Sequence, residues 1–377
     1  MSNWRLVRLD FSRTPVHFGE VGIGIEETSE RVRSDTLFSA LINTYVRLFG
    51  VEDVTEFLEL FPIENKSLDK QERLPPVQIS STFIYTYEKD QTKDLYRYYL
   101  PRPANFPPGY PEYDLEFFKS YKKLKYLPLD IWRRWYQESG FSTDNKNSDR
   151  TELIAQTKTK ETKGALAEAG VFNYSKTYSI ATYPKVSIDR RTAATNFYHT
   201  GFTQFNCEQN DKGKEKRSGL YFLLYFPQEN PKLEHRLNAT LNLLGEDGLG
   251  GERSSGAGRF EVEYWGDLPP DWEKIVNFQN AQHHCLLSLF WRKSLEDNFL
   301  DNSSYELIER GGWIGSPFSG RQLRRKKIHM FAEGSVFNSQ PSGQLALVTP
   351  DGFNKHKIYR SGISLSIPIN VKPESSE

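Results

Sequence analysis

The sequence predicts an α+β fold built from two units, and three features of the chain support this. In the first 265 residues, segments with the two-residue period of strands alternate with two segments of helical period. A glycine-rich loop separates the second helix from the strand that follows it. Pro269-Pro270 then interrupts the chain before a further set of short β-rich segments. We therefore expect one domain over residues 1–265 and another over 266–377.

Length and charge limit the possible classes of function. The chain of 377 residues is long enough for two hydrophobic cores. Its 49 Lys and Arg residues balance 49 Asp and Glu residues, so nucleic-acid binding would have to come from local patches. One such patch contains no acidic residue, and its cations are Arg321, Arg324, Arg325, Lys326 and Lys327.

Metal, redox and membrane functions are not indicated. The two cysteines, Cys207 and Cys285, form no Cys-x-x-Cys pair, so neither a zinc knuckle nor a redox motif is supported. His283 and His284 adjoin Cys285, but neighbouring side chains of a strand point to opposite faces, so we expect no metal and no cofactor. No apolar signal region and no apolar run of membrane-spanning length occur. These features predict a cytoplasmic protein without membrane contact.

The first unit begins with a strand, a helix and a second strand. Residues 4–11 alternate as strands do, and residues 79–87 form another β-rich run. Between them apolar residues recur at helical spacing from Ser34 onward, and Ser34 is a suitable N-cap. Free N–H groups at this helix start, with Arg33 beside them, would suit an anion. An ordinary capped helix packed on a sheet explains the same residues equally well.

A long insertion, about residues 88–218, follows these elements. Its first part is rich in Tyr, Pro and Lys, which predicts irregular structure with a short helix over 130–136. Its later part, residues 183–199, has two alternating arms around a polar tip, which is the pattern of a β-hairpin.

The predicted hairpin carries residues suited to single-stranded nucleic acid. An apolar wedge with arginines beside it can separate a base from its stack. The candidate binding residues of the hairpin are Lys185, Arg190, Arg191, Thr192, Asn196 and Phe197. A solvent-facing hairpin without a ligand is the alternative interpretation.

The end of the first unit repeats the strand, helix, strand order. An apolar strand over 219–226 precedes a helix over 231–244, and a strand over 259–264 closes the unit. The complete order is strand, helix, strand, insertion, strand, helix, strand. This is the split βαβ pattern of the ferredoxin-like fold, which RNA-recognition domains share.

The loop between this last helix and strand is rich in Gly, Ser and Arg. Gly lacks a Cβ, so another backbone can approach it closely, and N–H, hydroxyl and guanidinium groups all bind phosphate oxygens. The candidate residues are Gly248, Gly250, Gly251, Arg253, Ser254, Ser255, Gly256 and Arg259. Walker and dinucleotide motifs need a different spacing and a strand, loop, helix order. We interpret the loop as a cradle for a phosphate backbone, with a flexible surface linker as the alternative.

The second unit is predicted to consist of short strands joined by loops. β-rich runs over 284–291, 327–337, 343–348 and 362–369 predict strands, and Gly334 breaks the second of them.

Together these segments resemble the RAMP superfamily of CRISPR-associated proteins. Among them, the chain is most similar to the fourth subunit of type III-A (Csm) effector complexes. The matching residues lie in 33–41, 188–192, 248–260 and 329–335, in the order of that family. The glycine loop alone would indicate only the superfamily, whereas the combination is more specific. Residues 88–164 match no part of the family pattern.

This resemblance implies two ferredoxin-like units, with the hairpin as a β-hairpin thumb. It also implies a non-catalytic subunit of a ribonucleoprotein in antiviral defence, which holds the 5′ repeat-derived tag of crRNA. Its partners would be that tag, the large cyclase and nuclease subunit, and the first backbone RAMP subunit. In this interpretation the start of the first helix at Arg33 and Ser34, the hairpin and the glycine loop all contact RNA.

Two other functions stay open on the sequence. Some RAMP proteins cleave precursor crRNA without a metal, with a His as general acid or base, and His199 or His17 could serve here. No second proton carrier at a compelling spacing accompanies either residue. A structural assembly module without RNA contact is the other alternative, and the arginines of the loop and hairpin argue against it.

Overall fold

An antiparallel sheet of eight strands forms the centre of the fold. In the computed structural model the described residues are 3–19, 24, 26–64, 73–90, 93–111, 113–142, 149–151, 153–154, 177–209, 215–279, 281–314 and 323–372. Six strands follow the order β10-β1-β9-β3-β4-β5, and β2 and β8 also pair with β9. Their bounds are β1 Trp4–Asp10, β2 Gln78–Ile79, β3 Phe83–Asp90, β4 Lys93–Pro101, β5 Tyr126–Pro128, β8 Cys207–Gln209, β9 Glu215–Tyr225 and β10 Glu261–Gly266.

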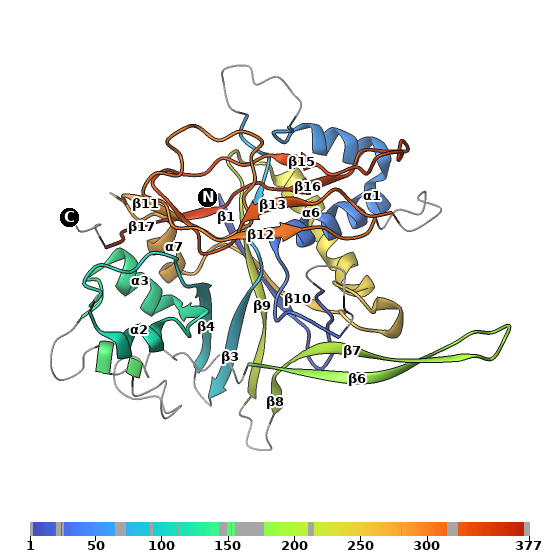
Figure 1. Cartoon of the computed structure of the whole chain (residues 1–377), viewed down its shortest axis with the longest axis horizontal. Helices are drawn as coiled ribbons and strands as arrows, with labels where there is room; N and C mark the ends of the chain where they lie inside the picture. Colours follow the sequence, from blue (N-terminus) through green and yellow to red (C-terminus); the bar gives the residue numbers. More distant parts are fainter. Residues whose placement is uncertain are drawn as a thin grey trace.

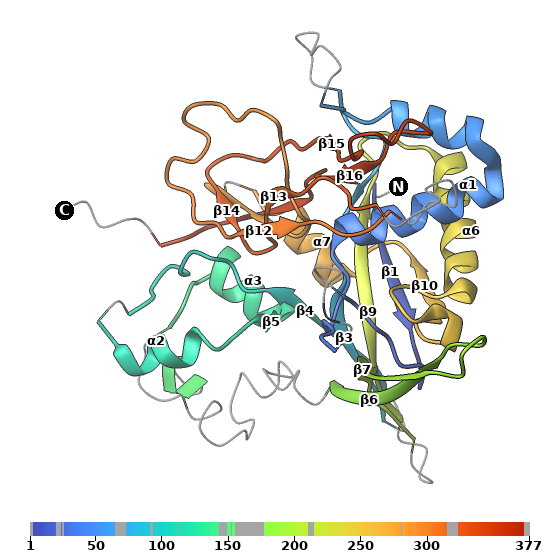
Figure 2. The same ribbon diagram turned by 45° about the vertical axis from the view of Figure 1, so that its right-hand side comes forward.

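Two helices, α1 (Ser34–Glu59) and α6 (Pro231–Asp247), lie side by side on one face of this sheet (Figures 1 and 2). α1 connects β1 to β2 and β3, and α6 connects β9 to β10. β9 lies between β1 and β3, and β1 lies between β9 and β10, so the two strand–helix–strand units interlock. The element order predicted for the first unit is therefore confirmed.

The insertion is more ordered than the sequence predicted. β4 pairs with β3, and two helices follow, α2 (Leu115–Tyr121) and α3 (Leu129–Gln137). The predicted short helix is α3, but the expectation of otherwise irregular structure is wrong for the described part. The large aromatic side chains fully buried there are Phe117, Tyr121, Trp132, Trp135 and Tyr136. The Tyr-rich composition thus reflects a local core, whose period is obscured in the sequence by intervening Pro and Lys residues.

The C-terminal part consists of small antiparallel sheets. After α7 (Pro270–Val276), the order β14-β11-β17 forms one sheet, while β12 pairs with β13 and β15 with β16. The bounds are β11 His283–Leu286, β12 Leu307–Arg310, β13 Ile328–Phe331, β14 Val336–Phe337, β15 Leu345–Leu347, β16 Tyr359–Ser361 and β17 Ser366–Ile369. Gly334, with φ +89°, lies between β13 and β14, at the predicted break. A second ferredoxin-like unit stays a prediction.

One hydrophobic core extends through both parts of the chain. It includes Leu6 and Leu9 of β1 together with Ile367 and Ile369 of β17. Side chains on both sides of the predicted boundary at 265 therefore pack against the same cluster. The division into two domains stays a prediction.

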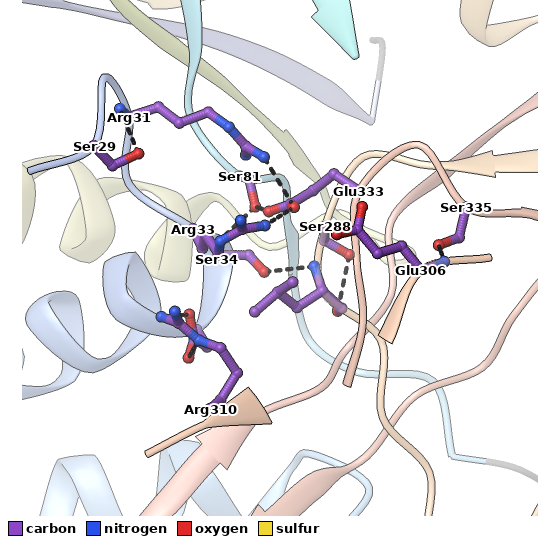
Figure 3. Close-up of polar contacts among 12 residues, drawn as sticks. Ser29, Arg31, Arg33, Ser34, Ser81, Ser288, Glu306, Arg310, Glu333 and Ser335 are labelled. Carbon is purple, nitrogen blue, oxygen red and sulfur yellow. Dashed lines mark hydrogen bonds and ion pairs between the residues drawn. The ribbon is translucent and has the colours of Figure 1, made fainter. Parts of the chain in front are cut away.

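A buried carboxylate joins the start of α1 to the C-terminal part. Glu333, which follows β13, has no exposed side-chain surface and accepts hydrogen bonds from Arg31 at 3.0 Å, from Arg33 and from Ser81 (Figure 3). Burial alone would raise the pKa of Glu333, but the charges of Arg31 and Arg33 lower it well below its ordinary value. The carboxylate is therefore ionised and held between the two parts.

Asp35, in the first turn of α1, forms a second buried contact between the two parts. Nε and Nη2 of Arg310 donate to its carboxylate at 3.0 and 2.9 Å, and Arg360 donates to the same group. Burial alone would raise the pKa of Asp35, but Arg310 and Arg360 lower it to about 2. This ion cluster connects α1 with β12 and β16.

We predict that Asp35→Asn destabilises the protein by about 3–5 kcal/mol at neutral pH, because it leaves two buried guanidinium groups without their counter-charge. A carboxyl group with a lowered pKa stabilises the fold above its ordinary pKa, and this contribution is lost as the pH falls through the folded value. The difference in free energy of unfolding between wild type and variant should therefore become smaller as the pH falls from 4 to 2. Urea unfolding across this range measures both effects.

Asp351→Asn is the matched control for this prediction. The Asp351 carboxylate also pairs with a cation, Lys326, at 2.8 Å, but its side chain is 94% exposed. Its removal should change stability by no more than about 0.5 kcal/mol. Equal losses in the two variants would contradict the role assigned to the buried cluster.

Candidate nucleic-acid interface

The glycine loop that follows α6 has a backbone that other residues adopt only with strain. Gly248 ends the helix with φ +88°, and its N–H donates to the Leu244 carbonyl at 2.8 Å. Gly250 has φ +100°, and a Cβ there would lie 2.4 Å from the His17 carbonyl oxygen. The inner half of the loop therefore needs glycine both for its conformation and for close packing.

Residues 15–18 form a strap that fixes this inner half. The N–H of Gly251 donates to the His17 carbonyl at 2.8 Å, and the N–H of Gly258 donates to the Pro15 carbonyl at 2.9 Å. On its other side the strap contacts the hairpin, because Nδ1 of His17 lies 2.7 Å from the Gly201 carbonyl oxygen. Val16 forms a bridge with Thr203 as well. The loop is thus held in place, which excludes the interpretation as a flexible linker.

The outer half of the loop faces solvent. Arg253, Ser254 and Ser255 form a single turn of 3-10 helix between two left-handed residues, Glu252 and Gly256. All three of these turn residues, and Gly256, are exposed. In the described part of the chain no acceptor contacts the N–H of Arg253 or Ser254. Adjacent N–H donors with a guanidinium group beside them form a concavity suited to an anion. Arg259 is also exposed, just before β10.

The predicted hairpin is present and longer than expected. β6 (Tyr178–Ile188) pairs with β7 (Thr195–Phe205), and both extend away from the body of the protein (Figure 1). The carboxylate of Asp189 accepts the N–H groups of Arg191 at 2.7 Å and Thr192 at 3.1 Å. These backbone hydrogen bonds lower the pKa of Asp189. The tip is therefore a defined turn that presents Arg190, Arg191 and Thr192 to solvent.

The two faces of the hairpin differ in chemistry, because paired residues of antiparallel strands point to the same side. One face presents apolar side chains to solvent, each 52–63% exposed, and these are Ile180, Val186, Ile188 and Phe197. Asn196 is exposed on the opposite face, next to the tip. Exposed apolar side chains grouped on a projecting element indicate a binding surface.

Lys185 links the hairpin to the glycine loop. Its ammonium group pairs with the Glu252 carboxylate and lies 3.2 Å from the Ser255 hydroxyl. It also lies 5.1 Å from the ring centroid of Phe202 on β7. The two elements singled out in the sequence are therefore in direct contact, through Lys185 and Glu252, which are 67 residues apart in the chain. Lys185 lies on the face of the hairpin opposite the apolar face, so the loop contacts that opposite face. We call the loop residues 252–256 together with the hairpin residues 178–205 the loop–hairpin surface.

The start of α1 does not match its prediction. The cap residue is Arg33 rather than Ser34, and no side-chain hydrogen bond caps the helix. Ser34 is only 3% exposed, its N–H donates to the Ser81 hydroxyl at 2.8 Å, and its own hydroxyl accepts the N–H of Leu289. The expectation of a free N–H group at this residue is wrong, because the Ser81 hydroxyl, between β2 and β3, accepts it. The Arg33 guanidinium group forms an ion pair there with the Glu333 carboxylate.

Sequence reasoning missed two residues of this surface. His17 was considered only as an acid or base, yet its ring is buried and it supports both the loop and the hairpin. Glu252, among the glycines, pairs with Lys185 of the hairpin. Both residues act through contacts between segments distant in the chain, which periodicity does not reveal.

Two structural observations bear on other classes of function. Within the described residues, no three His, Cys, Asp or Glu side chains gather in a way that could hold a metal ion. No helix in those same ranges is long and apolar enough to cross a membrane.

Comparison with known proteins defines the class to which this fold and loop belong. Residues 12–261 match the sequence model of the RAMP superfamily, so the chain belongs to that superfamily. Residues 279–369 match the model of the CRISPR Csm4 C-terminal domain. The similarity to the fourth-subunit type of RAMP protein, predicted from four short segments, is thereby confirmed.

Individual relatives agree with this assignment. A Csm4 protein of a CRISPR system from Methanocaldococcus jannaschii is 27% identical, covering 95% of this chain and 96% of its own. The Csm4 protein from Thermococcus onnurineus is 24% identical over 92% of this chain and 93% of its own. The crystal structure of a Csm3–Csm4 subcomplex of a type III-A CRISPR-Cas interference complex contains a similar chain. That chain has a TM-score of 0.55 and 20% identity, with 97% of this chain and 99% of that chain covered. The structural likeness shows a shared fold.

We predict that Gly250→Ala and Gly256→Ala differ in their effect on stability. Both residues have positive φ, which costs a substituted residue about 1–2 kcal/mol. A Cβ at Gly256 meets nothing within 4 Å, whereas one at Gly250 would collide with the His17 backbone. Gly250→Ala should therefore lose about 1–3 kcal/mol more than Gly256→Ala. Urea unfolding compares the two, and equal losses would mean that the strap does not hold the loop.

Proposed function

We propose that this protein is a non-catalytic, RNA-binding subunit of a type III-A CRISPR effector complex in the cytoplasm. In this proposal it holds the 5′ repeat-derived tag of crRNA on the loop–hairpin surface. The observation that carries the proposal is the contact of Lys185 with Glu252 and Ser255, which joins a phosphate-binding loop to an exposed apolar hairpin. A single-stranded RNA offers both chemistries, since it has a phosphate backbone and unstacked bases.

The glycine loop supplies the phosphate contacts in this proposal. The N–H groups of Arg253 and Ser254 and the Arg253 and Arg259 guanidinium groups can all donate to phosphate oxygens. The Ser255 hydroxyl instead donates to the Glu252 carbonyl at 2.8 Å and so helps to fix the turn. Gly250 and Gly251 act beneath them by allowing the loop to lie against the strap, and Gly248 allows close contact with the backbone of Ala257 and Gly258. The glycines thus serve mainly the shape of the cradle, and Gly256 is the one with open space around it.

The hairpin supplies stacking contacts and acts as a thumb. Phe197 and Val186 are cross-strand partners on its apolar face, and Arg190 and Arg191 lie beyond them at the tip. Such a wedge can pass between nucleotides while the arginines contact the adjoining backbone. We also interpret the order β10-β1-β9-β3 as a ferredoxin-like unit that carries both elements.

Partner subunits follow from the relatives. Similar chains occur in crystal structures of a Csm3–Csm4 subcomplex and of a Csm1–Csm4 cassette with pppApApA, the latter with a TM-score of 0.50 and 17% identity. We infer that this chain likewise joins a large subunit to a backbone RAMP subunit.

The proposal assigns no catalytic role to either candidate histidine. The His17 ring is buried between the strap and the hairpin, where its Nδ1 contacts a backbone carbonyl. The His199 ring packs edge-on against Phe197, with ring centroids 4.8 Å apart. Both arrangements favour packing over proton transfer to RNA.

We predict that Arg253→Ala, Arg259→Ala and Arg191→Ala each lower the salt dependence of binding to tag RNA. Each lost phosphate contact should reduce the slope of log Kobs against log salt by about 0.7, the value for single strands. Titration of labelled tag RNA at several salt concentrations measures this slope, and the RNA should be recovered intact. Lys274→Ala removes an exposed cation of α7 and should leave the slope unchanged. Unchanged slopes in all three arginine variants would refute the phosphate cradle.

We predict that Phe197→Ala weakens binding to tag RNA by about 1–3 kcal/mol, because a stacked ring is lost. Stacking involves no counterion release, so the salt slope should stay as in the wild type. The ring is 61% exposed, so the melting temperature should hardly change. Tyr113→Ala removes another exposed ring, outside the hairpin, and should affect neither property. A lower melting temperature with unchanged affinity would instead identify Phe197 as a packing residue.

A further inference from the structure

A cluster of three arginines surrounds one carboxylate where α1 meets the C-terminal part. Arg310 ends β12, Arg360 lies in β16, and both donate to Asp35. Figure 3 shows Arg310 reaching toward the first turn of α1. Arg325, between β12 and β13, donates through Nε to the Trp313 carbonyl at 3.1 Å. This cluster is separate from the loop–hairpin surface and includes part of the basic stretch noted in the sequence.

Among the described residues, Asp35 is the one carboxylate that these arginines contact. Arg360 is 3% exposed, shares Asp35 with Arg310, and has an Nε group without a hydrogen-bond partner. No carboxylate in the described part of the chain contacts Arg325. Burial, together with the charges of Arg360 and Arg310, lowers the pKa of Arg325 to about 10. Cations without a counter-charge in a low-dielectric site are costly, and a bound anion would relieve this cost.

Arg325 is the member of the cluster that an anion can reach. Its side chain is partly exposed, whereas Arg310 and Arg360 are buried behind it. Beside it, the Arg324 guanidinium lies 4.7 Å from the ring centroid of Trp313, which is 37% exposed. The intervening sequence, residues 315–322, contains no Asp or Glu that could supply a counter-charge.

We propose that Arg325 binds a phosphate group of RNA at a second site, with Arg310 and Arg360 providing the field behind it. Arg324 and Trp313 would contact the adjoining nucleotide, since guanidinium and indole groups both stack on bases. The planar guanidinium fork fits phosphate oxygens, and the cation–aromatic pair at the rim favours a nucleotide over an acidic peptide. This inference rests on the proposed function, because it takes the phosphate to be that of the same bound RNA.

The test compares Arg325→Gln with Lys326→Gln in binding labelled tag RNA over a salt series. Lys326 is the adjacent residue, is exposed, and already pairs with Asp351. Its variant therefore loses the same charge as Arg325→Gln but leaves the proposed site intact. Arg325→Gln should weaken binding at least about tenfold and lower the salt slope by about 0.7. Lys326→Gln should change affinity less than about threefold. Sodium phosphate should raise the melting temperature of the wild type above that in sodium chloride of equal ionic strength, and Arg325→Gln should abolish this difference.

Several outcomes would overturn the inference while sparing the proposed function. If Arg253→Ala weakens RNA binding and Arg325→Gln does not, RNA does not occupy the second site. Equal effects of Arg325→Gln and Lys326→Gln would mean diffuse attraction rather than a site. Normal RNA affinity in Arg325→Gln with lost assembly of the partner subunits would assign the cluster to an acidic protein surface. Failure of the proposed function is distinct, since neither loop nor hairpin variants would then affect RNA binding.

Discussion

The buried carboxylates of Asp35 and Glu333 are the contacts on which the arrangement of the two parts depends. Each accepts hydrogen bonds from two arginines, and each lies at the start of α1 or against it. A carboxylate placed in the interior is stable only while its cations are in reach. These contacts therefore link the start of α1, which lies on the central sheet, to the C-terminal sheets. The same sheet carries α6 and the glycine loop.

On that scaffold one short strap, residues 15–18, connects the glycine loop to the hairpin. His17 contacts Gly251 through its carbonyl oxygen and Gly201 through its ring. The loop and the hairpin therefore both contact His17. On the outer side, Lys185 of the hairpin contacts the loop directly. Preorganisation of this kind matters for a single-stranded ligand, because a disordered site would lose conformational entropy on binding. The loop presents donors in a fixed geometry, while the hairpin tip stays far from the core.

The sequence predicted the local features well and the long-range contacts poorly. Alternation and glycine spacing sufficed for the hairpin and for the loop after α6, because both depend on residues close together in the chain. The prediction for Ser34 was wrong because its hydroxyl bonds to Leu289, which is 255 residues away. The aromatic core around Trp132 was missed for a related reason, since burial of a Tyr- and Trp-rich segment depends on what packs over it. Local patterns carry no information on such partners.

The balanced net charge conceals a division of the arginines into two groups. Arg31, Arg310 and Arg360 pair with buried carboxylates and so contribute to folding. Arg253 and Arg191 are exposed, and no carboxylate in the described ranges pairs with them. A guanidinium group that already has a carboxylate partner would lose that partner on binding phosphate, whereas an unpaired one exchanges only water and counterions. In the proposed function the unpaired group is therefore the one suited to RNA, and its position on the loop and hairpin, rather than the total charge, would determine where the RNA binds.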